Sequence, residues 1–135
     1  MAIINNQFKI GQVAKLTGLS VKSIRYYHDI GLVQGKRNEA GYRLYSDADI
    51  NSLNFIHQCR DLGFSLEHCQ HLLSLNNNQQ RQAENVRQLA IEHLAEVNQK
   101  ITKLEKLKRD LEQMIGHCQG GKQSKCAILD GINKA

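Results

Sequence analysis

The sequence predicts a mainly α-helical protein in which a compact N-terminal domain precedes one long helix and a short C-terminal loop. Apolar residues recur at helical spacing along most of the 135 residues, and glycines and capping residues separate these repeats. Only residues 32–45 depart from this pattern, with turn-forming residues followed by β-prone aromatics. The chain contains no proline, and its last aromatic residue is Phe64.

Two short helices are expected at the start of the domain. Apolar residues between positions 10 and 16 predict a helix that stops at Gly18. Ser20 is placed to cap a second helix over residues 21–30, and Gly31 follows its end. Two helices joined by a glycine-containing turn form the helix-turn-helix pattern.

A small hairpin and two further helices complete the expected domain. The turn chemistry of residues 38–41 and the alternation of residues 42–45 predict a β-hairpin, or wing. Ser46, with a carboxylate three residues later, predicts a capping box that opens a helix ending at Gly63. Ser65 is placed to cap the next helix.

One long helix is expected after the polar run of residues 76–78, over residues 80–115 with Gly116 ending it. Its narrow apolar stripe needs a partner helix, and we favour a two-fold homodimer over a helix folded back on its own domain. The predicted domains are 8–75, 76–116 and 117–135. The stripe consists of Ala83, Val86, Ala90, Leu94, Val97, Ile101, Leu104, Leu111 and Ile115.

The positive charge of the chain is concentrated near its start. Lys and Arg outnumber Asp and Glu by 18 to 13, and residues 1–43 hold seven basic and two acidic side chains. Such a basic segment favours a polyanion as partner, with double-stranded DNA the first candidate. The side chains expected to contact DNA are Lys15, Lys22, Ser23, Arg25, Tyr26, Arg37, Tyr42, Arg43 and Arg60.

Composition also excludes several classes of protein. The sequence has no apolar run long enough to span a membrane, and its first residues are too polar for a secretory signal. Four cysteines without such a signal indicate a reducing compartment, so we expect a cytoplasmic protein. No set of nucleophile, base and orienting group is recognisable, and we do not expect an enzyme.

Two cysteines near the C-terminus are candidate metal ligands. Cys118 and Cys126 bracket Gly120 and Gly121, so the loop can fold to bring the two thiols together. Thiolates select soft cations such as Cu(I), whereas zinc sites usually have closer pairs and four ligands. Unrelated surface cysteines and a reversible disulfide remain alternatives.

Several motifs in the first 75 residues resemble those of the MerR family of transcriptional regulators. The chain departs from the family pattern at His28, where a glutamate is usual, and at Gln34-Gly35, where proline is common. The matching motifs are Ile10-Gly11-Gln12-Val13-Ala14-Lys15, Ser23-Ile24-Arg25-Tyr26-Tyr27, Ile30-Gly31-Leu32, Gly41-Tyr42-Arg43 with Tyr45, and Leu62-Gly63-Phe64-Ser65-Leu66.

The resemblance implies a winged helix-turn-helix dimer, joined by an antiparallel coiled coil of the long helices, that binds a pseudo-palindromic promoter. Family members bend and untwist an over-long promoter spacer when activated, so that RNA polymerase can engage both promoter elements. A DNA-binding activator is therefore expected, and a coiled-coil adaptor or a thiol enzyme is a more remote alternative.

The C-terminal loop resembles the effector site of the copper-, silver- and gold-responsive branch, the CueR-like regulators. The resemblance implies that Cys118 and Cys126 hold one Cu(I), Ag(I) or Au(I) ion per site. Ala83 stands where divalent sensors have cysteine and the monovalent branch has serine, and Arg87 could balance the negative charge of two thiolates. His117, beside Cys118, is a further candidate near the ion. The alternative signals are an oxidant or a divalent metal such as zinc.

Overall fold

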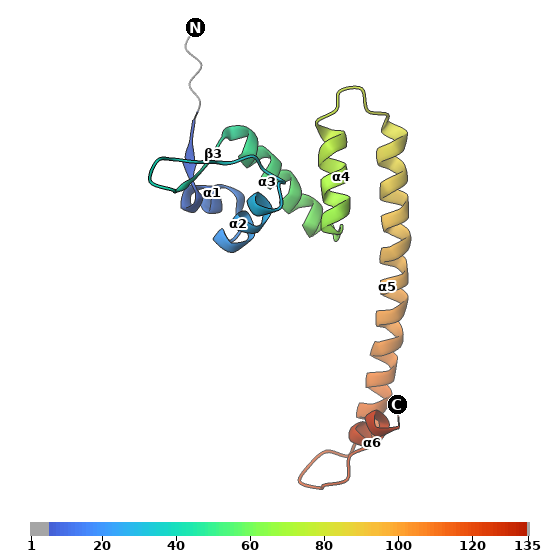
Figure 1. Cartoon of the computed structure of the whole chain (residues 1–135). Coiled ribbons are helices and arrows are strands. Elements are labelled where there is room, and N and C mark those ends of the chain that lie inside the picture. The colour runs from blue at the N-terminus through green and yellow to red at the C-terminus, as the bar shows by residue number, and fades with distance from the viewer. Residues whose placement is uncertain (1–5, 135) are drawn as a thin grey trace. The chain divides into compact units, whose positions relative to one another are not determined.

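The structure, a computed structural model, describes residues 6–134 and contains six helices and three short strands within that range (Figure 1). Residues 1–5, where the sequence argues against a secretory signal, and Ala135 lie outside the described residues. The chain divides into two compact units, one ending at Val86 and the other beginning at Arg87, and each is described by itself. The elements are β1 (Phe8–Lys9), α1 (Ile10–Thr17), α2 (Val21–Asp29), β2 (Lys36–Arg37), β3 (Arg43–Tyr45), α3 (Asp47–Asp61), α4 (Leu66–Asn76), α5 (Ala83–His117) and α6 (Ala127–Asn133).

The predicted caps begin the helices of the N-terminal unit. The Ser20 hydroxyl accepts from the backbone N–H of Ser23 at 3.0 Å, and the Ser65 hydroxyl accepts from the N–H of His68 at 3.1 Å. Ser46 and Asp49 form a reciprocal capping box at the start of α3. These bonds satisfy N–H groups that have no partner inside the helix, which is why α2, α3 and α4 start where the sequence predicts.

The wing is a three-stranded antiparallel sheet in the order β1-β3-β2. The predicted hairpin is present, with Arg37 opposite Arg43, but β1 was not predicted and pairs Phe8 with Tyr45. A strand of two residues carries no alternation that a sequence pattern could reveal. Because β1 leads directly into α1, the third strand ties the wing to the first helix.

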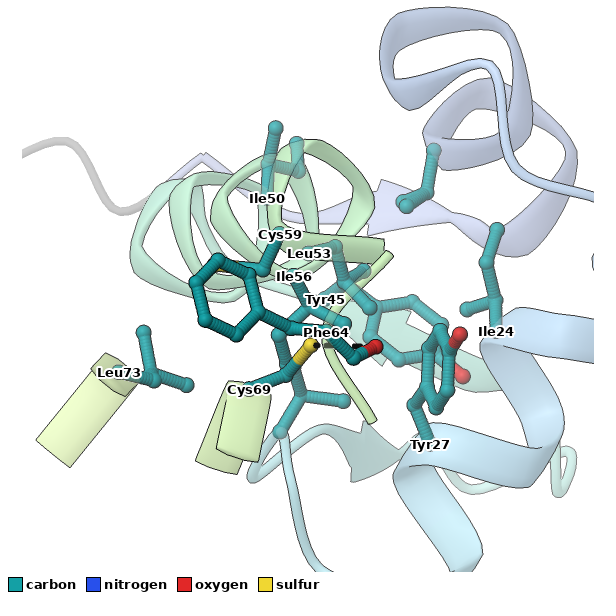
Figure 2. Packing of buried hydrophobic residues seen from close by; sticks show 12 residues of the cluster. Ile24, Tyr27, Tyr45, Ile50, Leu53, Ile56, Cys59, Phe64, Cys69 and Leu73 are labelled. Atoms are coloured by element: carbon teal, nitrogen blue, oxygen red, sulfur yellow. Dashed lines mark hydrogen bonds between the residues drawn. The ribbon is translucent and has the colours of Figure 1, made fainter. Parts of the chain in front are cut away.

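Figure 2 shows the hydrophobic core of the N-terminal unit, to which all four of its helices and the strand β3 contribute. Tyr27 and both cysteines of this unit, Cys59 and Cys69, are buried, as their apolar helix faces predict. The Cys69 sulfur points toward the carbonyl oxygen of Phe64 at 3.8 Å. Burial raises the pKa of the Cys69 thiol to about 11, so it behaves as a small apolar side chain. The core residues are Val13, Ile24, Tyr27, Val33, Tyr45, Ile50, Leu53, Ile56, Cys59, Phe64, Cys69 and Leu73.

The long helix differs from its predicted bounds at both ends. It begins at Ala83, because the preceding residues form a turn in which Arg81 donates to the Asn78 carbonyl at 3.2 Å. It continues through Gly116 to His117, so the prediction that Gly116 ends the helix is wrong. One glycine costs an α-helix only about 1 kcal/mol, which neighbouring turns can offset.

The apolar stripe of α5 is exposed in the single chain. Only His93 is buried among the side chains of this helix, whereas Leu104 is 63% exposed. The other leucines and isoleucines of the stripe are also exposed, and Val86 and Val97 are half-buried. None of the helices within residues 6–134 is long and apolar enough to cross a lipid bilayer.

Candidate functional site

Helix α2 presents three of the predicted DNA-contacting side chains to solvent. Lys22, Arg25 and Tyr26 are exposed, and 53% of the Tyr26 surface is open. Ile24 and Tyr27, on the opposite face, anchor the helix in the core. One face of α2 therefore packs in the core, and the opposite face presents basic side chains to solvent.

One pocket joins α2 to the end of α3. It is lined by Lys22, Ser23 and Tyr26 from α2, and by Arg60 from α3. The Arg60 guanidinium donates to the carbonyl oxygen of Phe64 at 2.8 Å, which fixes the side chain beside the turn after α3. Arg60, which is distant in sequence, therefore lines the same concavity as three predicted residues of α2, and Lys22 and Arg60 make this concavity cationic.

A second pocket joins α1 to the wing. It is lined by Lys15 from α1 together with Tyr42 and Arg43 from the wing. Lys9 also lines it and was not singled out from the sequence, where its positive charge was the only signal. Neither Arg25 nor Arg37 belongs to these pockets. The Arg37 guanidinium donates to the Gly41 carbonyl within the wing at 3.2 Å.

Arg43 lines this pocket and also forms bonds with residues of α2. Its guanidinium forms a 2.9 Å ion pair with Asp29 and donates to the Arg25 carbonyl at 3.2 Å, and its side chain is only 17% exposed. These bonds join β3 to α2. Arg43 therefore has less free surface for an external anion than the exposed Arg25 and Arg37 have.

The two candidate metal ligands lie together at the end of the second unit. Cys118 follows α5 directly and Cys126 is the N-cap of α6, with their sulfur atoms 3.7 Å apart and both thiols free. Gly120 and Gly121, at φ of 68° and 76°, adopt the left-handed conformation that lets the loop reverse direction. The loop thus brings the thiols together as the sequence predicts.

The start of α6 favours the thiolate form of Cys126. Hydrogen bonding from the backbone N–H of Leu129 is the main cause that lowers the pKa of this thiol, and the Cys118 thiol and the N–H of Ile128 act in the same direction. Free N–H groups at a helix start stabilise a negative sulfur. Cys126 therefore forms a thiolate more readily than an ordinary cysteine, and the thiolate is the form that binds cations and reacts.

The donor set around the loop is small. Within residues 6–134, no group of three or more His, Cys, Asp or Glu side chains is placed to hold one metal ion. His117 lines a separate small pocket with Met114 and Asp130, between the end of α5 and α6. Thiolates are soft donors and select soft cations.

Ala83 and Arg87, expected near the ion, lie at the other end of α5 from the thiols. Arg87 and His117 belong to one helix, and their separation of about 30 residues corresponds to about 45 Å at the α-helical rise. Within a single chain the structure does not bring Arg87 to Cys118 or Cys126.

The comparisons with known proteins identify the family. Residues 8–76 match the MerR HTH family regulatory proteins, and residues 50–114 match the family described as MerR, DNA binding. The chain belongs to the MerR family. The helix-turn-helix and wing of this MerR protein are thus the fold of transcriptional regulators that bind DNA, and not of an enzyme.

Curated relatives cover nearly the whole MerR chain. Heavy metal-dependent transcription regulator 2 of Rhizobium meliloti (strain 1021) is 40% identical over 124 residues, which are 91% of this chain and 84% of that protein. HTH-type transcriptional regulator CueR of Vibrio cholerae serotype O1 is also 40% identical over 124 residues, with 91% of this chain and 89% of that protein covered.

A solved structure shares the fold of both units. The transcription regulator PbrR691 from Ralstonia metallidurans CH34, in complex with lead(II), is 29% identical with a TM-score of 0.77. The match covers 93% of this chain and 98% of that one. It supports the prediction of a mainly helical MerR protein with a wing and a long helix, which the structure confirms.

Proposed function

We propose that this protein is a cytoplasmic, metal-responsive transcriptional activator of the MerR family that binds promoter DNA as a homodimer. Its signal is Cu(I), or Ag(I) or Au(I), with one ion held by Cys118 and Cys126. The bound ion links the two sides of the loop. Closure of the loop and α6 onto the α5 helix of the second subunit then shifts the DNA-binding domains. The distorted promoter becomes accessible to RNA polymerase, as control by DNA deformation requires.

The observation that carries the choice of ion is the pair of free thiols 3.7 Å apart with no third donor beside them among the described residues. The lowered pKa of Cys126 supplies thiolate at a lower pH than an ordinary cysteine would. Relatives named as heavy metal-dependent regulators and as CueR support a metal signal in general. The soft two-thiol set favours a monovalent ion within that class.

The exposed stripe of α5 supports the homodimer. A row of leucine and isoleucine side chains open to water is stabilised when a second helix covers it, and a copy of the same chain provides an identical stripe. In an antiparallel pair, the start of one α5 lies near the end of the other. Ala83 and Arg87 of one chain would then approach the thiols of the other, where two thiolates and one monovalent ion leave a net negative charge.

Binding of Cu(I) to the reduced full chain tests the ion assignment. Anaerobic titration against a Cu(I) chelator is expected to show one ion per chain, lost in Cys118→Ser/Cys126→Ser protein, because hydroxyls are poor ligands for soft ions. Zn(II) is expected not to displace Cu(I). The variant Arg87→Gln tests whether the positive charge of Arg87 offsets the negative charge of the two thiolates. It should weaken Cu(I) binding about 10-fold.

Two results of this titration would contradict the proposal. If Cu(I) still binds after both thiols are replaced, Cys118 and Cys126 are not its ligands. If Zn(II) displaces Cu(I), the signal is a divalent metal ion. Unchanged affinity and response in the Arg87→Gln protein would remove only the role of Arg87.

Removal of one exposed arginine tests the DNA surface. Arg25→Ala is expected to weaken binding to a promoter fragment about 10-fold and to make the slope of log affinity against log salt shallower by about 1, because one phosphate contact is lost. The control Lys103→Ala removes the same charge from the exposed face of α5. Equal effects of both variants would show non-specific attraction and contradict the assigned surface.

An oxidant is the second candidate signal, and the 3.7 Å sulfur separation favours it. A peroxide would accept two electrons and two protons from the thiols, which would become a disulfide, while hydrogen peroxide became two water molecules or an organic hydroperoxide became one alcohol and one water. Transcription induced by peroxide alone, with a loop disulfide formed in the same protein, would establish this signal in place of the metal.

A further inference from the structure

The side chain of His28 occupies space that only a glycine at position 35 leaves open. A Cβ atom added to Gly35 would lie 2.6 Å from both Cε1 and Nε2 of the His28 ring and 3.0 Å from its Cδ2. Real Cβ atoms do not approach ring atoms this closely. His28 belongs to α2 and Gly35 precedes β2, so the ring is the point at which the helix meets the start of the wing.

The other edge of the ring contacts the middle strand of the wing. Nδ1 of His28 lies 3.2 Å from the hydroxyl of Tyr45 and 3.5 Å from Nη1 of Arg43. The rings of His28 and Tyr45 meet edge-on with centroids 5.4 Å apart. The Tyr45 hydroxyl is the nearer of the two polar partners of Nδ1.

The same contacts continue to the surface predicted to bind DNA. Arg43 reaches from the ring to Asp29 and to the carbonyl of Arg25, and it lines the pocket that holds Lys15 and Tyr42. His28 therefore stands between the exposed basic face of α2 and the exposed side chains of the wing.

We propose that His28, seated against Gly35, is a positioning residue that sets the distance between the DNA contacts of α2 and those of the wing. This inference rests on the proposed DNA binding. Wing and helix contact phosphates at separate points, and both sets fit one duplex only at a fixed spacing. His28 itself does not touch the DNA in this account, and it acts through Arg43 and the start of β2.

Footprinting with His28→Ala and Gly35→Ala proteins tests the proposal. Each variant is expected to bind the promoter about 10-fold more weakly than the wild type, and its hydroxyl-radical footprint should lose protection at the wing while keeping protection at α2. Affinity for unrelated DNA should stay within about 2-fold, since the net charge of the surface is unchanged. A merely structural role would weaken both kinds of binding together.

Gly31→Ala is the matched control for Gly35→Ala. Gly35 and Gly31 both have a positive φ, of 49° and 84°, but no atom lies within 4 Å of a Cβ added at Gly31, so its substitution strains the backbone without a clash. The double variant His28→Ala/Gly35→Ala should bind better than additive losses predict, because the clash is gone, whereas His28→Ala/Gly31→Ala should be additive. If His28→Ala does not fold, Gly35→Ala carries the test, since it keeps every polar group.

The outcomes separate this inference from the proposed function. If the wild-type protein gives no salt-dependent footprint on the promoter, the proposed DNA binding is wrong, and this inference is wrong with it. A wild-type footprint that His28→Ala or folded Gly35→Ala leaves intact at the wing would overturn the inference alone. Additive losses in both double variants would show that His28 and Gly35 are not coupled, and would overturn it as well.

Discussion

Protein carrying both Cys118→Ser and Cys126→Ser is expected to bind its promoter normally and to give no rise in transcription when Cu(I) is added. Serine keeps the size and polarity of the loop but removes the soft donors that hold the ion. The loop belongs to the unit that begins at Arg87, whereas the predicted DNA contacts belong to the other unit. Promoter affinity should therefore stay within about 2-fold of wild type while induction falls to the uninduced level.

In vitro transcription from the promoter, with the affinity measured on the same fragment, checks this prediction. Ser124→Ala is the matched control, because it changes an exposed residue of the same loop and leaves both thiols in place. This control should respond to Cu(I) as the wild type does. Induction by Cu(I) in the double serine protein would contradict the assigned metal site.

Leu104→Glu is expected to convert the proposed homodimer into a monomer. Leu104 is 63% exposed in the single chain, so a carboxylate there costs the isolated helix little. In the proposed two-fold dimer each stripe covers the other, and both subunits would bury the new charge. Burial of an unpaired carboxylate costs several kcal/mol, so the dissociation constant should rise at least about 100-fold.

Sedimentation equilibrium of wild-type and variant proteins measures this effect. Lys106→Glu places the same carboxylate two residues away, outside the stripe on an exposed position of α5, and should remain dimeric. The DNA-binding unit is unaltered in both variants, so far-UV circular dichroism should show that both proteins remain folded. A Leu104→Glu protein that sediments as a dimer would contradict the assigned interface.

Local signals in the sequence were enough to predict most of the N-terminal fold. Ser20, Ser46 and Ser65 each use their own hydroxyl to satisfy a nearby N–H, and such bonds depend only on residues within three positions. The closeness of Cys118 and Cys126 was also predictable, because two glycines lie between them. In each case the cause and its effect lie within one short segment.

Contacts between distant segments could not be read from those patterns. The ion pair of Arg43 with Asp29 and the fit of His28 against Gly35 depend on how the wing folds onto α2. The sequence marked His28 and Gly35 only as departures from the family pattern, and it gave no sign that the two meet. The start of α5 was missed for a different reason: the turn held by Arg81 is local, but it competes with helix formation.

Footprinting of the promoters next to the coding sequence, with and without Cu(I), tests the central claim most directly. The account predicts that metal-free protein already protects a promoter, and that Cu(I) or Ag(I) keeps this protection while increasing cleavage at the centre of the spacer, where the DNA is distorted. Zn(II) should leave the metal-free pattern unchanged. A spacer change produced by Zn(II) but not by Cu(I), or no change with either ion, would contradict the proposal that two thiols at the end of α5 couple a monovalent ion to promoter DNA.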